Sequence, residues 1–209
     1  RERVASYGAV MVEYTGRMLS TFREGEVRNV HEDMMRLTRE IVAKTLFDAD
    51  LTQESARVGE AFEEVVRRFV EVPPGIPVID RIPTPGQRRY RRAVQTLDAM
   101  IYRLINERRG SGHDAGDLLS MLMGARDEDG GGRMSDRELR DEAITLFLAG
   151  HETTALVLSF VWLLLSQNPE AEAKLALELK EDDPLLVPPR NLNRKAGQHR
   201  SIRLRHLAK

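Results

Sequence analysis

The residues best suited to chemistry lie together inside a long apolar helical pattern, in the segment Ala149-Gly150-His151-Glu152-Thr153-Thr154. We call residues 149–154 the motif segment. Burying a carboxylate or a hydroxyl is costly unless the group is paired or functional. A carboxylic acid beside an alcohol can pass protons from solvent to a buried reactive centre. The pattern indicates either a proton-delivering site or a helix-packing site built from small residues, and by itself it favours neither.

The spacing of these residues on a helix decides what they could do together. Thr145, Ala149 and Thr153 recur every four residues and share one face, with Glu152 beside Thr153. A small residue on that face lets a flat ligand approach the backbone. Gly150 and the threonines allow the helix to distort, because a hydroxyl can bond a carbonyl four residues back. We therefore expect a groove and a local irregularity near Glu152 and Thr153. In the packing alternative, Glu152 simply reaches solvent.

Several other chemistries are excluded by the sequence. His151-Glu152 begins like the HExxH zinc motif, but position 155 is alanine, so the second histidine ligand is missing and no metal site is predicted. The chain has no cysteine, which excludes a disulfide, a thiolate nucleophile and a cysteine metal site. No Walker, GxGxxG or GxSxG motif occurs.

Composition and charge narrow the class of protein. Apolar residues make up 41% and charged residues 31% of the chain, as in globular proteins, and the formal net charge is −1. This balance offers no electrostatic reason to expect a nucleic acid partner. No uncharged apolar run reaches about 18 residues, so no membrane span is predicted. The charged start Arg1-Glu2-Arg3 does not resemble a signal peptide. We expect a cytoplasmic protein.

The elements that would position the motif segment are helices, and no convincing strand is found. Apolar periodicity predicts helices over residues 1–22, 29–46, 88–109, 118–125 and 135–166, with further ones starting at Thr52 and Pro169. Expected helix starts are Asn29, Asp117, Pro169, and Ser135 with Glu138 as a capping box. Five prolines between positions 73 and 85 predict an extended loop over residues 73–87.

A family resemblance accompanies this pattern. Residues 141–154 resemble the oxygen-activating central helix of the cytochrome P450 family, the haem-thiolate monooxygenases, and match Ala/Gly-Gly-x-Asp/Glu-Thr-Thr/Ser at every position. Asn168-Pro169-Glu170 is similar to the start of the family's next helix. Leu46-Phe47 with Asp50, and Pro83-Thr84-Pro85, resemble upstream segments. The resemblance covers residues 1–181 in order.

The resemblance implies a mainly α fold, the helical portion of the cytochrome P450 fold without its β-rich edge and cysteine haem-ligand loop. It implies insertion of one oxygen atom into a small apolar organic substrate, with haem as cofactor and a redox partner as electron source. It also assigns roles to residues: proton delivery to Glu152 and Thr153, haem contact to Ala149 and Gly150, and substrate contact to Thr145 and Leu148.

The chain also departs from the family pattern. The family's iron ligand is a cysteine thiolate, which favours O–O cleavage, and no cysteine is present here. We expect the chain alone to be inactive. Residues 182–209 do not resemble the family, and residues 184–209 hold seven Lys or Arg and no Asp or Glu. A truncated or frameshifted gene would explain this tail, which we expect to be poorly packed. The rival hypothesis is a non-catalytic helical module that binds a partner or an apolar ligand.

Overall fold

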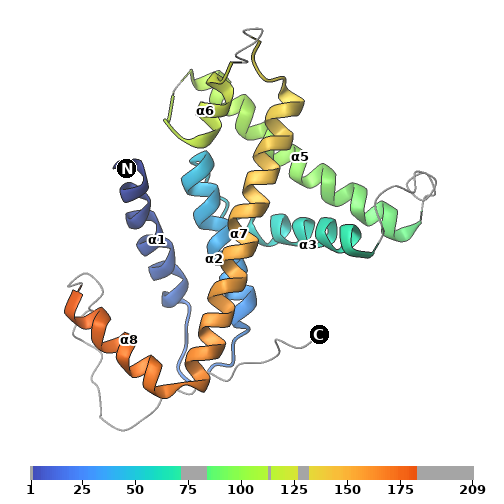
Figure 1. The fold of residues 1–209 in the computed structure, drawn as a ribbon. Helices are drawn as coiled ribbons and strands as arrows, with labels where there is room; N and C mark the ends of the chain where they lie inside the picture. Colours follow the sequence, from blue (N-terminus) through green and yellow to red (C-terminus); the bar gives the residue numbers. More distant parts are fainter. Residues whose placement is uncertain (1, 72–83, 113, 127–131, 183–209) are drawn as a thin grey trace.

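The structure is a computed structural model that describes residues 2–71, 84–112, 114–126 and 132–182, and these fold mainly as α-helices (Figure 1). Within these ranges the only strand-type pairing is an isolated bridge between Arg126 and Arg133. The mainly α fold expected from the sequence is confirmed. Helix α7 (Asp136–Gln167) runs through the middle of the molecule, and α2 (Val30–Phe47) packs along it.

Helix α1 (Glu2–Ser20) packs beside α2, and both ends of α2 are set by short-range hydrogen bonds. The Asn29 side chain accepts a hydrogen bond from the backbone N–H of Glu32, which satisfies a donor that a helix start leaves unpaired. At the other end Asp48 adopts a left-handed conformation with φ of 51°, and its N–H bonds the Lys44 carbonyl. The start predicted at Asn29 is confirmed.

Helices α3 (Ser55–Glu71) and α5 (Pro85–Ser111) lie side by side and extend away from α7 (Figure 1). The prediction that α5 begins at residue 88 is wrong. The Thr84 hydroxyl accepts from the Gln87 N–H at 3.1 Å, and Pro85 occupies the first helical position, where no N–H is needed. The loop predicted over residues 73–87 therefore fails for residues 85–87, and residues 72–83 lie outside the described part.

The start of α3 also differs from the prediction. Thr52 was expected to open this helix, but its N–H bonds the Asp50 carboxylate at 2.9 Å, and residues 52–54 form a turn. Such local side-chain bonds compete with helix formation. The helix therefore begins three residues later, at Ser55.

Helix α6 (Leu118–Gly124) begins where the sequence predicts. The Asp117 carboxylate accepts the Ser120 N–H at 2.8 Å and also pairs with Arg108 of α5, at 2.6 Å. Both side chains of this ion pair are largely buried, so it ties α6 to α5. Helix α8 (Pro169–Asp182) begins with proline at its first position, again as predicted.

The capping box of α7 is present as predicted. The Ser135 N–H donates to Glu138 Oε2 at 2.8 Å, and the Glu138 N–H donates to Ser135 Oγ at 3.3 Å. From there α7 continues to Gln167 without a break. The local irregularity expected near Glu152 and Thr153 is not seen, because residues 136–167 are all regular α-helix.

Two clusters of buried side chains hold α7 in place. In the larger cluster the rings of Phe47, Phe62 and Phe147 stack, with Phe147 between the other two at centroid distances of 5.8 and 5.1 Å. These rings come from α2, α3 and α7. In the second cluster Ala155 of α7 packs with residues of α1 and α2, among them Tyr14 and Met34. The first cluster fixes α7 just before the motif segment, and the second fixes it just after.

Candidate active site

One face of α7 carries most of the predicted site residues. Thr145, Ala149 and Thr153 are exposed at four-residue intervals, and Leu148 and Glu152 are half-buried beside them. Because all lie within about two and a half turns of one helix, the structure brings them together as the sequence spacing requires. Between Thr145 and Thr153 this line of residues carries only the methyl group of Ala149.

The opposite face of α7 is fully buried. Phe147, His151 and Ala155 each have no exposed surface, and they also recur at four-residue intervals. The two sets are offset by two residues, which is about 200° around an α-helix. The burial of Phe147, His151 and Ala155 therefore fixes the rotation that leaves Thr145, Ala149 and Thr153 exposed.

Helix α2 holds the backbone of the motif segment directly. A Cβ atom on Gly150 would lie 3.3 Å from Cγ2 of Val42, so glycine is the residue that allows this close approach. Gly150 is half-buried, and its missing side chain points toward α2. At the next residue, the Thr38 hydroxyl shares its one proton between the His151 carbonyl at 3.0 Å and the Met34 carbonyl of its own helix at 2.8 Å. Two adjacent residues of the motif segment are thus fixed by α2.

The hydroxyl groups near the motif segment bond backward along the helix. Thr153 Oγ1 donates to the Ala149 carbonyl at 2.8 Å, and Thr154 Oγ1 donates to the Gly150 carbonyl at 2.9 Å. Thr145 makes the same kind of bond to Asp141, at 2.8 Å. Each hydroxyl keeps lone pairs that can accept a proton donor. Thr153 can give up its own proton only by releasing the Ala149 carbonyl.

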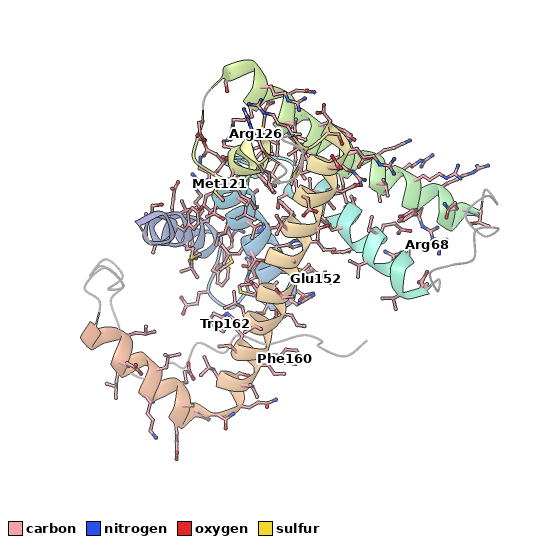
Figure 2. The ribbon with its side chains drawn as sticks, turned by 45° about the horizontal axis from the view of Figure 1, so that its top comes forward. Arg68, Met121, Arg126, Glu152, Phe160 and Trp162 are labelled. Atoms are coloured by element: carbon pink, nitrogen blue, oxygen red, sulfur yellow. The ribbon has the colours of Figure 1, made fainter. Side chains whose placement is uncertain are left out.

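Glu152 is the acidic group next to Thr153. Figure 2 shows it on α7, in the same helix as Phe160 and Trp162. It is half-buried and has no hydrogen-bond or ion-pair partner within the described residues. A partly exposed carboxylate without a fixed cation is able to exchange protons with solvent. Glu152 and Thr153 together have the chemistry of a short proton path.

His151 is a structural residue whose role sequence reasoning missed, because it was considered only as half of a zinc motif. Its Nδ1 lies 2.9 Å from the Phe147 carbonyl, so Nδ1 carries the proton. Burial lowers the pKa of His151, the bond to Phe147 opposes this, and the nearby Arg39 cation lowers it further. The four-residue spacing of Phe147, His151 and Ala155 was the signal that could have revealed a buried histidine.

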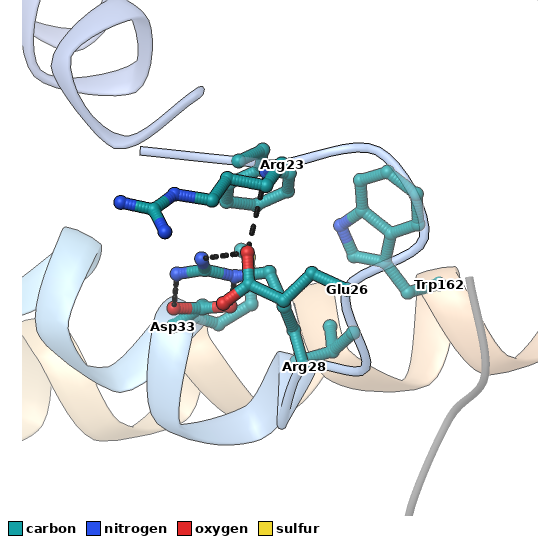
Figure 3. Close-up of a pocket in the computed structure, with 8 residues that line it drawn as sticks. Arg23, Glu26, Arg28, Asp33 and Trp162 are labelled. Carbon is teal, nitrogen blue, oxygen red and sulfur yellow. Dashed lines mark hydrogen bonds and ion pairs between the residues drawn. The ribbon is translucent and has the colours of Figure 1, made fainter. Parts of the chain in front are cut away.

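A small pocket lies farther along α7, where the connection between α1 and α2 meets Trp162 (Figure 3). Its volume is about 40 Å³, and its lining is mainly apolar. Of the charged groups at its edge, Arg28 is paired with Asp33 at 2.8 Å and with Glu26 at 3.2 Å. This pocket is separate from the motif segment.

Comparison with known proteins decides which family this helical arrangement represents. Residues 2–182 match the cytochrome P450 family. The chain belongs to this family. The matched residues include the motif segment on α7.

Two curated relatives come from Streptomyces. The cyclooctat-9-en-7-ol 5-monooxygenase of Streptomyces melanosporofaciens is 34% identical over 185 residues, which cover 86% of this chain and 39% of the relative. The pentalenene oxygenase of Streptomyces avermitilis is 34% identical over 183 residues, which cover 86% and 40%. The chain thus spans about two fifths of the length of these cytochrome P450 relatives.

Solved structures agree on the fold. The heme domain of cytochrome P450DA superposes with a TM-score of 0.68 at 25% identity, covering 82% of this chain and 38% of that one. The retinoic acid bound cyanobacterial CYP120A1 superposes with a TM-score of 0.74 at 23% identity, covering 88% and 40%. The chain therefore has the helical part of the cytochrome P450 fold.

Helix α7 is long and apolar enough to cross a membrane, judged by length and composition alone. Its most apolar stretch of 18 residues has a mean hydropathy of 1.5. The sequence analysis missed this because it counted only uninterrupted apolar runs. In the structure the same helix packs against α2 and α5 and supplies Phe147 and His151 to the buried core. A mostly buried core helix of a soluble protein passes the same test, but only 17% of this stretch is buried. One such helix is weak evidence for a membrane span.

Proposed function

We propose that this chain forms the oxygen-activating helical part of a haem monooxygenase that inserts one oxygen atom of dioxygen into an apolar organic substrate. The observation that carries the proposal is the accessible face of Thr145, Ala149 and Thr153, with Glu152 at its edge. That face belongs to a helix whose opposite side is fully buried. Preorganised groups of this kind cost little to align when the reaction occurs.

The residues present fit one side of a flat macrocycle. Ala149 presents only a methyl group between two threonines, so a planar ring can approach the helix there. We assign Ala149 and the backbone of Gly150 to this cofactor contact. The residues present cannot supply the family's thiolate ligand, because the sequence contains no cysteine. Within the described residues, no group of three His, Asp or Glu side chains could hold a metal ion either.

The chain's own residues would hold and move protons and shape the substrate site. When bound, haem supplies the redox chemistry of dioxygen. Glu152 takes a proton from solvent and passes it toward the Thr153 hydroxyl. Thr153 accepts it on a free lone pair and donates its own proton into the site as it leaves the Ala149 carbonyl. Thr145 and Leu148 lie at one end of the face, where a substrate would contact them.

The relatives support the substrate class and the electron source. Two of them are named for oxidation of cyclooctat-9-en-7-ol and of pentalenene. A third, from Bacillus cereus, is a bifunctional cytochrome P450/NADPH–P450 reductase, 27% identical over 199 residues. We propose a small apolar substrate, a reductase-type redox partner and a cytoplasmic location. We also propose that the family domain occupies residues 1–181, with residues 182–209 outside it, which the end of the family match at residue 182 supports.

The test is spectroscopic. Haem is added to the 209-residue chain, and the reduced carbon monoxide spectrum is recorded. We expect no thiolate-type band from this chain, and recovery of the band when a family C-terminal region with its cysteine is joined after residue 181. A thiolate-type band from the chain alone would contradict the proposal that it lacks the ligand. Failure of the joined protein to bind haem would favour the non-catalytic helical module.

The joined enzyme also tests Thr153. We expect Thr153→Ala to divert reducing equivalents from product to peroxide, because the hydroxyl that delivers the proton is gone. Ser166→Ala is the matched control. Ser166 also donates a backward bond on α7, to the Leu163 carbonyl, but it lies about three and a half turns beyond Thr153. Equal peroxide formation by the two variants would remove Thr153 from the proton path.

A further inference from the structure

A buried polar cluster lies behind the motif segment, on the side of α7 that faces α2 and α3. It contains Arg39 of α2, Ser55 and Gly59 of α3, and His151 of α7. Arg39, Ser55 and His151 are 6%, 2% and 0% exposed. Buried polar groups are normally paired, and a buried cation is especially costly to leave without compensation. Nothing in the proton path through Glu152 and Thr153 uses this cluster.

The guanidinium of Arg39 occupies the space left by the missing side chain of Gly59. A Cβ atom at Gly59 would lie 2.5 Å from Nη1, 2.7 Å from Cζ and 2.8 Å from Nη2 of Arg39. Gly59 lies in the second turn of α3, inside the helix, where glycine costs helix stability relative to alanine. Its presence there is explained by the planar group that lies on it. Arg39 also donates from Nε to the Ser55 hydroxyl at 3.3 Å.

His151 has an unused acceptor in the same region. Since Nδ1 carries the proton that is donated to the Phe147 carbonyl, Nε2 is a bare acceptor in the neutral ring. Nε2 is buried and has no hydrogen-bond partner within the described residues. A guanidinium has five N–H donors, of which the bond to Ser55 uses one. The cluster therefore contains both a donor group with capacity to spare and a buried acceptor.

The helix spacing brings these two groups to one place. Thr38 bonds the His151 carbonyl, and Arg39 is the next residue of α2. Gly59 lies beneath Arg39, and Phe62, one turn later on α3, contacts the His151 ring at a centroid distance of 5.1 Å. Arg39 is also the charged group that acts on the His151 ring electrostatically.

We propose that Arg39 and His151 form a buried polar pair that fixes α3 and α2 against the motif segment, so that Arg39 is a positioning residue for Glu152 and Thr153. The pair acts through the neighbouring backbone, since Glu152 and Thr153 follow His151 directly. That these two residues deliver protons rests on the proposed function. The coupling between Arg39 and the motif segment does not depend on the proposed function. This coupling can be measured in the chain without cofactor.

The first experiment uses the unaltered 209-residue chain with ¹⁵N-labelled histidine and arginine. Long-range ¹H–¹⁵N spectra report which ring nitrogen is protonated, and His151→Phe identifies the His151 signals. We expect a protonated Nδ1, a bare Nε2, and magnetisation transfer between the Arg39 guanidinium protons and the His151 ring protons. A His151 ring protonated at Nε2, or no transfer to Arg39, would overturn the proposal.

The second experiment measures amide hydrogen exchange in variants. Arg39→Met keeps the apolar stem but removes the charge and the donors, and Arg39→Lys keeps the charge but replaces the planar guanidinium with an ammonium. Gly59→Ala displaces the guanidinium without altering Arg39 itself. We expect all three to shift the His151 Nε2 resonance. We also expect them to speed exchange of the amides of residues 150–154 about tenfold more than that of α1 amides, which corresponds to about 1.4 kcal/mol of local free energy.

Matched controls separate positioning from general loss of stability. Arg36→Met removes a partly exposed arginine one turn earlier on α2, and Gly110→Ala adds a methyl group on α5 where nothing lies within 4 Å. Both should leave the His151 resonance and the ratio of exchange rates unchanged. If the Arg39 and Gly59 variants speed exchange equally in all helices, or behave like these controls, Arg39 is not a positioning residue. If haem binding fails while the coupling is observed, the proposed function is refuted and the positioning role of Arg39 stands.

Discussion

Phe147 is the side chain whose replacement tests the packing of α7 most directly. Its ring lies between Phe47 and Phe62 with interplanar angles of 4° and 2°, and it has no exposed surface. Phe147→Leu keeps an apolar side chain but removes the two stacked contacts, with Phe47 and Phe62. Aromatic pairs contribute about 0.5–1.5 kcal/mol each beyond simple burial, so the loss of two should lower the free energy of unfolding by about 1–3 kcal/mol. A small additional cost is expected from the changed shape.

The assay is urea unfolding followed by circular dichroism, with the midpoint and the slope fitted separately. Phe160→Leu is the matched control, because it makes the same change on the same helix at a position that is 48% exposed. We expect the control to alter stability by no more than about 0.5 kcal/mol. Equal losses in the two variants would show that the three-ring stack does not fix α7, and the reasoning about its buried face would fail.

Three further predictions concern single contacts. Ser135→Ala should cost about 1 kcal/mol in urea unfolding, because the capping box at the start of α7 is lost. Asp117→Ala should cost about 3 kcal/mol in the same assay, since it removes both the cap of α6 and the partner of the buried Arg108. The pKa of His151 is lowered from its ordinary value of 6.5, mainly by burial, so below about pH 6.5 the unfolded chain binds more protons. Stability should therefore fall as pH drops from about 6.5 toward the lowered pKa, and His151→Phe should remove that part of the pH dependence in unfolding curves.

The elements that depend on local chemistry could be predicted from the sequence. The capping box at Ser135 and the cap at Asn29 are confirmed because both depend on bonds between residues three positions apart. The predicted start of α5 is wrong for a related reason. Proline was read only as a breaker, although Thr84 before Pro85 is also a good helix start.

Contacts between distant residues could not be predicted in the same way. The bond from Thr38 to the His151 carbonyl joins residues 113 positions apart, and no periodicity in the sequence marks it. Arg39 looks like a surface residue of α2 by its charge. Its burial depends on Gly59, whose lack of a side chain matters only once α2 and α3 are packed together. The residues that share the exposed face of α7 could be predicted from the spacing within one helix. The contacts by which α2 and α3 hold that helix could not.

The two faces of α7 explain why the motif segment tolerates polar residues in an otherwise apolar helix. Phe147, His151 and Ala155 are buried in the core on one side of α7. The ring N–H of His151 is satisfied there by the Phe147 carbonyl of the same helix. Thr145, Ala149 and Thr153 are turned about 200° away, so the two threonine hydroxyls lie outside that core. Both sets belong to the same helix, so a rotation of α7 would move the buried set and the exposed set together. The packing of the buried face therefore determines which atoms the accessible face presents to a cofactor and a substrate.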